Sequence, residues 1–190
     1  AILNRGKLID VLDVASTSTK KMANLMVGRE VNFQTEKKEA KFGPVVLDVQ
    51  NLTVKNRDHF EVVKNVSFQV HAGEIFAIAG VSGNGQVEIA DAVAGLAKAF
   101  SGKIFLNGKE ITQDSIRERT LAGISYIPED RQNVGLVMDF TLSENLGLKN
   151  YFREPFSHGG ILNKKEFDNY ADRLIKEYDI RSSQGSRTVV

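Results

Sequence analysis

The chain has 190 residues, of which 42% are hydrophobic and 26% charged, a composition typical of a soluble globular protein with one sizeable core. Its 25 basic and 24 acidic residues nearly balance. The net charge is therefore too small to attract the whole chain electrostatically to nucleic acid or to anionic lipid. There is no cysteine, so disulfides and thiolate metal sites are excluded. No apolar run approaches the roughly 20 residues that a membrane-spanning helix needs, so we expect no direct insertion into a membrane.

The first 31 residues contain the patterns of a few small elements. Residues 7–14 are expected to form a short strand, and a helix is expected from Ser18 to a stop at Gly28. These elements bury too little apolar surface to make a domain. We therefore interpret residues 1–31 as the end of a preceding domain.

A polar, apolar-poor segment separates this part from the rest of the chain. Residues 32–44 end in Gly-Pro and are typical of an exposed linker. The main domain is expected to occupy residues 45–190. The chain starts at Ala1 rather than at a methionine, so we expect it to be a piece of a longer protein.

The main domain alternates between strand and helix patterns. Strands are expected at 45–54, 60–70, 75–79, 103–106 and 124–127. Helical spacing is found for Ile89, Val93, Leu96 and Ala97, for residues 115–121, and for the apolar face formed by Phe167, Tyr170, Ala171, Leu174, Ile175 and Tyr178. Capping boxes are expected at Thr141–Glu144 and Asn163–Glu166, where a side-chain acceptor precedes a carboxylate by three residues.

The most informative feature is a glycine-rich turn between the expected strand 75–79 and the following helix. Gly80 and Gly85 have the spacing of a phosphate-binding loop, Gly-x4-Gly-Lys-Ser/Thr. The backbone amides of such a loop and the positive end of the next helix bind phosphate oxygens. Gln86 and Val87 stand where the motif has its lysine and its magnesium-binding hydroxyl. A lost charge-assisted hydrogen bond is worth about 1.5–3 kcal/mol, so we expect weak nucleotide binding.

Two other interpretations of this turn stay open. The glycines could serve only a tight connection between a strand and a helix. Alternatively, Gly83 and Gly85 could begin the dinucleotide-binding motif Gly-x-Gly-x-x-Gly, but Glu88 stands where that motif has its third glycine.

Together the motifs of the main domain resemble the second nucleotide-binding domain in the ATP-binding subunits of ABC transporters that import simple sugars and nucleosides. The likeness rests on Val66–Ile75 before the loop, Gly83–Gln86 within it, Ile124–Arg131 as the Q-loop region, Thr141–Asn145 at the start of the helical subdomain, and Met26–Glu30 in the preceding part. The resemblance implies an α/β fold, a P-loop NTPase of ABC type that is truncated, with an antiparallel β subdomain and the start of a helical subdomain.

Three motifs of this family are missing from the 190 residues: the signature loop, the magnesium aspartate with its catalytic glutamate, and the switch histidine. Two segments resemble such motifs superficially but lie too early in the chain. The signature loop is resembled by Ser157–Gly160, and the strand with the magnesium aspartate by Leu136–Asp139. We therefore expect that the chain ends before the signature motif, contains no catalytic residue and does not hydrolyse ATP alone.

The resemblance also implies a set of binding residues. The phosphate contacts would be Gly80, Val81, Ser82, Gly83, Asn84, Gly85, Gln86 and Val87. Phe60 is the candidate platform for adenine, with a place in a core strand as the equally open alternative. Glu129, at the position usually held by the Q-loop glutamine, is the candidate for the metal or the attacking water.

ATP and Mg²⁺ are the implied cofactors, bound weakly or not at all by this part of the protein. The implied partners are transmembrane permease subunits and a partner nucleotide-binding domain, with no role for nucleic acid. The implied location is cytoplasmic, at the inner face of the cell membrane. The leading hypothesis is thus an importer subunit whose site here binds nucleotide weakly. The alternative is a non-catalytic module that docks other subunits and binds no nucleotide.

Overall fold

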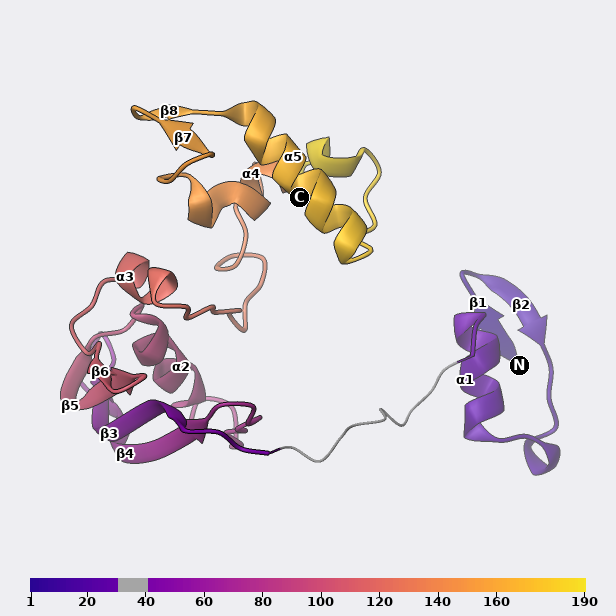
Figure 1. The fold of residues 1–190 in the computed structure, drawn as a ribbon. Helices are drawn as coiled ribbons and strands as arrows, with labels where there is room; N and C mark the ends of the chain where they lie inside the picture. The colour runs from indigo at the N-terminus through magenta and orange to yellow at the C-terminus, as the bar shows by residue number, and fades with distance from the viewer. Residues whose placement is uncertain (31–40) are drawn as a thin grey trace. The chain divides into compact units, whose positions relative to one another are not determined.

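The computed structural model describes residues 1–30 and 41–190. The chain divides into two compact units, Ala1–Phe42 and Gly43–Val190, each of which is described by itself (Figure 1). The boundary falls within the predicted linker 32–44, most of which lies outside the described residues. None of the helices described here combines the length and the apolarity that crossing a bilayer requires.

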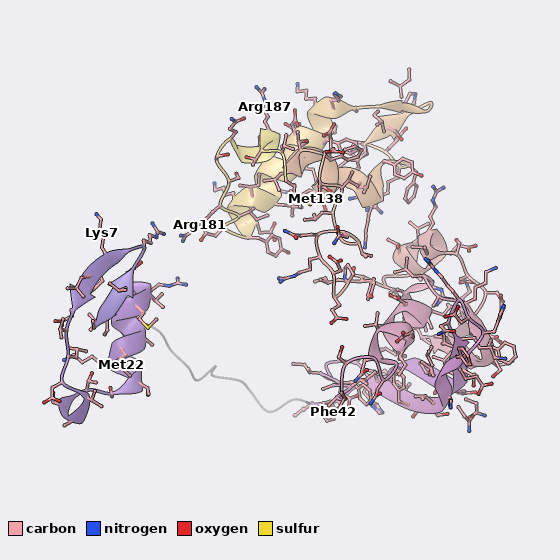
Figure 2. All side chains as sticks on the ribbon, turned by 180° about the vertical axis from the view of Figure 1, so that it is seen from behind. Lys7, Met22, Phe42, Met138, Arg181 and Arg187 are labelled. Carbon is pink, nitrogen blue, oxygen red and sulfur yellow. The ribbon has the colours of Figure 1, made fainter. Side chains whose placement is uncertain are left out.

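The N-terminal unit consists of a hairpin and a helix. Strands β1 (Ile2–Asn4) and β2 (Lys7–Asp10) pair antiparallel, and they are followed by the 3-10 helix η1 (Val14–Ser16) and by α1 (Thr19–Val27). The helix prediction is confirmed, because the Ser18 side chain caps α1 and Gly28 ends it in the left-handed conformation. Figure 2 shows Met22 on this helix. The predicted strand 7–14 is wrong beyond Asp10, where the Asp13 carboxylate accepts a hydrogen bond from Ala15 N and starts η1.

The second unit starts with an antiparallel sheet in the order β4-β3-β5-β6. Its strands are β3 (Val45–Lys55), β4 (Glu61–His71), β5 (Ala99–Leu106) and β6 (Lys109–Glu110). The predicted strands 45–54 and 60–70 are confirmed to within one residue, and β5 begins earlier than predicted. Helix α2 (Gln86–Ala94) packs on this sheet. The buried core consists of Val49, Leu52, Val54, Val63, Ile89, Ala92, Ile104 and Ile111.

The predicted strands 75–79 and 124–127 are wrong in this structure, because neither segment has regular secondary structure. A strand exists only when its backbone amides and carbonyls bond to a neighbouring strand. None of the strands in the described part of the chain pairs with these two segments. Their apolar side chains are accordingly exposed, Ile75 to 78% and Ile127 to 82%.

In the remainder of the second unit most of the regular structure is helical. It contains α3 (Ile116–Leu121), α4 (Leu142–Gly147), η2 (Leu148–Asn150), the hairpin of β7 (Ser157–His158) and β8 (Ile161–Leu162), α5 (Lys164–Glu177) and η3 (Gly185–Arg187). The ring of Phe156 contacts Phe167 edge-on at 5.3 Å between centroids. A side chain at Gly147 would collide with Phe167, so α4 and α5 pack closely.

The predicted apolar face of α5 is confirmed at most positions, since Phe167 and Ala171 are buried, but it is wrong at Tyr178. Tyr178 is the residue that caps the helix and is 69% exposed.

The structure confirms the first predicted capping box and the cap of the second. Thr141 and Glu144 exchange both hydrogen bonds at the start of α4, and Asn163 accepts from Glu166 N at the start of α5. A third box, between Ser115 and Glu118 at the start of α3, was not predicted, although its spacing is present in the sequence.

Candidate functional site

The glycine loop lies between residue 79 and helix α2, in the position that its sequence predicts. Gly83 and Gly85 have φ angles of +87° and +99°, which residues with a side chain rarely adopt. At Gly85 a side chain is also excluded by space, because a Cβ atom would lie 2.6 Å from the carbonyl oxygen of Val62 on β4. The loop is therefore held close against the backbone of β4 at the point where α2 begins.

The side chain of Gln86 is folded back over this loop. Its Nε2 donates a hydrogen bond to the carbonyl oxygen of Val81 at 3.2 Å. A Cβ atom added to Gly80 would collide with the same amide group, so the amide lies directly over Gly80. A side chain at Gly80 would therefore displace the Gln86 amide, which is the end of a flexible side chain, rather than the backbone of the loop.

The residues present fit a polyphosphate better than they fit a magnesium ion. The glycine loop runs directly into the N-terminus of α2, a helix of 9 residues, and backbone amides in this arrangement favour bound phosphate oxygens. Val87, on the first turn of α2, offers no polar atom for a metal. In the described part of the chain no three acidic or histidine side chains come together as a metal site would need.

Phe60 lies in the turn that connects β3 to β4. The carboxamide oxygen of Asn56 accepts hydrogen bonds from Phe60 N at 2.9 Å and from Asp58 N at 3.0 Å, which fixes this turn. The Phe60 side chain is 70% exposed. The alternative that Phe60 belongs to a core strand is therefore wrong, and its role as an adenine platform stays a prediction.

Glu129 is exposed in the turn that follows Pro128. Its neighbour Asp130 organises that turn, since its carboxylate accepts hydrogen bonds from Asn133 N at 2.9 Å and from Asn133 Nδ2 at 2.7 Å. These bonds, the backbone one above all, lower the pKa of Asp130. The role of Glu129 toward a metal or a water stays a prediction.

The two segments that imitate missing motifs have structural roles. Ser157–Gly160 forms strand β7 and the turn to β8, with both glycines in the left-handed region. Leu136–Asp139 precedes α4, and the Asn145 side chain holds it by accepting from Val137 N at 2.8 Å and donating to Val137 O at 3.0 Å. The interpretation of the second segment as an approach to the helical subdomain is confirmed.

Sequence reasoning missed two side chains that hold α2. Arg119 of α3 is 3% exposed and donates to the carbonyl oxygens of Ala92 and Val93 at 2.7 and 2.8 Å. Tyr126 donates from its hydroxyl to Asp91 Oδ1 at 2.7 Å. Burial, the hydrogen bond to Asp91 and the charges of Asp91 and Glu129 raise the pKa of Tyr126 to about 12. An arginine in a short helix and a tyrosine in an apolar run carry no sequence signal for such contacts.

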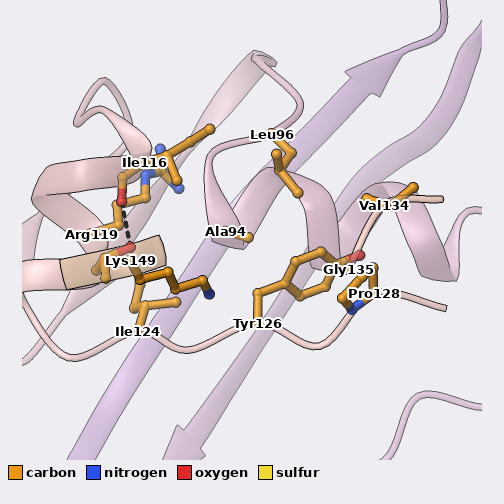
Figure 3. A pocket seen from close by; sticks show the side chains of 11 residues that line it. Ala94, Leu96, Ile116, Arg119, Ile124, Tyr126, Pro128, Val134, Gly135 and Lys149 are labelled. Carbon is orange, nitrogen blue, oxygen red and sulfur yellow. Dashed lines mark hydrogen bonds between the residues drawn. The ribbon is translucent and has the colours of Figure 1, made fainter. Parts of the chain in front are cut away.

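Arg119 and Tyr126 also line a cavity of about 170 Å³ between the end of α2, α3 and the segment 124–128 (Figure 3). Lys149 of η2 and Gly135 complete its wall. The cavity lies at the end of α2 opposite to the glycine loop, so it is not the predicted phosphate site.

The chain matches the family profile described as ABC transporter over residues 63–190, and it therefore belongs to the ABC transporter family. A solved structure, the dimer of the ATP-binding cassette MJ0796 in a post-hydrolysis state with ADP and phosphate, has a TM-score of 0.58 at 19% identity. The likeness covers 75% of this chain and 61% of that one. The predicted fold class, an α/β P-loop NTPase of ABC type present in part, is confirmed.

Two curated relatives are similar along nearly the whole chain. The chain is 48% identical to the guanosine import ATP-binding protein NupO of Bacillus subtilis, over 95% of this chain and 36% of the relative. It is 39% identical to the nucleoside import ATP-binding protein NupA of Lactococcus lactis, over 96% of this chain and 36% of the relative. The chain thus spans about a third of the length of these relatives.

Proposed function

We propose that the chain is part of the ATP-binding subunit of an ABC importer for nucleosides, and that its glycine loop binds the phosphates of ATP weakly. The observation that carries this proposal is the loop itself, in which Gly83 and Gly85 are left-handed, Gly85 packs on β4, and the chain then enters the N-terminus of α2. The similarity to NupO and NupA supports nucleosides as the transported class over sugars.

Weak binding follows from the side chain of Gln86. Its amide lies over Gly80 and is bonded to Val81 O, so a phosphate that uses the amides of this loop displaces it. Gln86 then offers a neutral donor, whereas a lysine would offer a cation. The loss of one charge-assisted hydrogen bond corresponds to about 1.5–3 kcal/mol, or about one to two factors of ten in affinity.

The proposed site is less suited to binding magnesium than to binding phosphate. When bound, Mg²⁺ neutralises phosphate charge and fixes the geometry of the nucleotide. Val87 replaces the hydroxyl that the motif uses for this ion, and Glu129 is the remaining candidate ligand. We propose that this part of the protein contributes to the closing of two nucleotide-binding domains around ATP more than it contributes to hydrolysis.

The proposed partners are permease subunits in the membrane and a second nucleotide-binding domain that completes the site, at the cytoplasmic face of the membrane. In this proposal residues 1–31 are the end of a first nucleotide-binding domain, 32–44 the linker, and 45–190 the first part of the second domain. The structural division at Phe42 and Gly43 supports this arrangement.

A docking module that binds no nucleotide is the second candidate function. It is favoured by the conformation of Gln86, because the hydrogen bond to Val81 O fills the loop with a group of the protein itself. The two candidates differ in whether ATP binds to the loop.

Isothermal titration of the full-length protein with ATP and magnesium distinguishes the candidates when it includes variants at Gly83. A Cβ atom at Gly83 meets nothing within 4 Å, and asparagine and aspartate tolerate its positive φ better than other residues do. Gly83→Asp adds a negative charge to the loop, and Gly83→Asn is a control of the same shape without the charge. We expect Gly83→Asp to abolish the heat of binding at this site while Gly83→Asn keeps it. Equal heats in the wild type and both variants would favour the docking module.

A further inference from the structure

Arg119 is a buried cation placed at the end of α2 that lies away from the glycine loop. Each of its guanidinium nitrogens donates to a backbone carbonyl. Nη1 donates to Ala92 O and Val93 O, Nη2 to Thr112 O at 2.8 Å, and Nε to Asp114 O at 3.0 Å. Four carbonyl oxygens from two segments of the chain therefore converge on one side chain.

The charge of Arg119 is compensated by these carbonyls and not by an ion pair. In the described ranges no carboxylate forms an ion pair with it, and the nearby Asp114 pairs with Lys109 at 3.5 Å. Ala92 and Val93 belong to the last turn of α2, where carbonyl groups lack the usual partner one turn further along the helix. Gly95 N at the end of the helix donates to Ala92 O at 3.3 Å, and Arg119 adds a second donor to that oxygen. A cation at this end also complements the helix dipole. The contacts of Arg119 are thus directed at the C-terminus of α2.

Few large side chains contribute to the apolar packing of α2: Ile89 lies in the core, and Val93 packs against the core while partly buried. The buried residues of this helix are Ile89, Ala92 and Ala94, so only one of them has a large side chain. At its N-terminus, where Gly85 packs on β4, no side chain of residues 1–30 or 41–190 forms a capping hydrogen bond. The polar contacts to Arg119, together with the Tyr126–Asp91 hydrogen bond, therefore determine much of the orientation of the helix.

We propose that Arg119 is a positioning residue for the nucleotide site. By holding the C-terminus of α2, it fixes the axis of a helix about 13 Å long, and with it the backbone amides that the glycine loop and the first turn present to phosphate. This inference rests on the proposed function of the loop in binding ATP. A displacement of one end of a rigid helix moves the other end, and binding sites lose affinity when supporting contacts no longer hold the ligating groups in place.

The test compares Arg119→Ala with a variant that destabilises the protein elsewhere. Phe167→Leu loosens the contact between α4 and α5 and touches no part of α2, so it controls for loss of stability alone. Both are made in the full-length protein and studied at temperatures where circular dichroism shows that they are folded. We expect ATP to bind Arg119→Ala about tenfold more weakly, whereas Phe167→Leu lowers the melting temperature and leaves the dissociation constant unchanged.

Two further measurements separate positioning from stability. Free guanidinium, at concentrations well below those that unfold the protein, is expected to restore ATP binding to Arg119→Ala, while the neutral analogue urea is not. Hydrogen exchange without nucleotide is expected to be faster at the amides of residues 83–90 in Arg119→Ala than in Phe167→Leu. Should Arg119→Ala not fold, Arg119→Lys takes its place. It keeps the charge but cannot donate to all four carbonyls, so we expect a smaller loss of ATP affinity and faster exchange at residues 83–90, without the guanidinium rescue.

The outcomes distinguish the failure of this inference from that of the proposed function. An unchanged dissociation constant in a folded Arg119 variant, or unchanged exchange at residues 83–90, overturns the positioning role. If the wild-type loop binds no ATP, the proposed function fails, and the exchange measurement still decides whether Arg119 orders the loop.

Discussion

Single side chains decide what the glycine loop can bind. Gly85 allows the loop to pack against Val62 O, and Gly80 makes room for the amide of Gln86. Gln86 in turn donates a hydrogen bond to Val81 O, so its side chain covers the loop. Val87 contributes no polar group. The backbone of this loop therefore suits phosphate, while its side chains do not add to the attraction.

Restoring the two missing groups should therefore strengthen nucleotide binding. For Gln86→Lys combined with Val87→Thr we expect a 10- to 100-fold lower dissociation constant for ATP with magnesium, on the order of 1.5–3 kcal/mol, measured by titration of the full-length protein. The control is Gln86→Met with Val87→Thr, which removes the bond to Val81 O and adds no charge. An unchanged dissociation constant in the lysine variant would mean that the geometry of the loop limits binding.

At the scale of elements, the starts of the helices follow most directly from the sequence. Ser18, Ser115, Thr141 and Asn163 each accept a hydrogen bond from a backbone amide at the start of a helix. In α3 and α4 a glutamate completes the box. These local signals are present in the sequence, since a cap needs only residues three positions apart.

The capping box of α4 should make stability depend on pH in the acid range. Hydrogen bonds from the backbone and the hydroxyl of Thr141 lower the pKa of Glu144 below its ordinary value of 4.5. A carboxylate whose pKa is lower in the folded state stabilises the fold above its unfolded pKa, and this contribution is lost as the pH falls through the folded pKa. Urea unfolding at pH 7 and below pH 4.5 should therefore show a smaller loss of stability for Glu144→Gln than for the wild type.

That effect should be modest, about 0.3–1 kcal/mol, as for an acidic side chain at a helix N-terminus. Asp172→Asn is a suitable control, because Asp172 is an exposed carboxylate in the middle of α5, away from both ends of the helix. The same pH dependence in the wild type and in Glu144→Gln would show that the Glu144 box does not respond to protonation.

At the scale of the whole molecule, the second unit contains a paired antiparallel sheet and two apolar segments, 75–79 and 124–127, with which no strand of the described residues pairs. Phe76 stacks on Phe68 of β4 at 5.0 Å between ring centroids, so the segment 75–79 rests on the sheet without joining it. A groove lined by residues of 75–78 and 124–126 runs between the two segments. Apolar surface of this kind is normally covered in a folded domain.

Backbone hydrogen exchange of the 190-residue chain should reveal this difference. We expect the amides of 75–79 and 125–127 to exchange rapidly, because no strand among the described residues pairs with them, and the amides of Leu52 and Ile104 in the paired sheet to be strongly protected. The amide of Ile124 is left out of this comparison, because it donates to Arg119 O at 3.0 Å. The comparison is made within one sample, so it needs no variant. Strong protection at 75–79 would show that this segment is paired in solution.

The sequence determined the local features of this protein by itself: the strands β3 and β4, the capped helices, the glycine loop and the order of motifs that resembles the ABC family. Each depends on residues that are close together in the chain, or on spacing that can be counted. The tertiary structure alone decided that Gln86 folds over Gly80, that Arg119 is buried against the end of α2, and that 75–79 and 124–127 remain unpaired. The last two features depend on which groups far apart in the chain meet in space. The first depends on the conformation that one side chain adopts over its own loop, and a pattern of residue types contains neither kind of information.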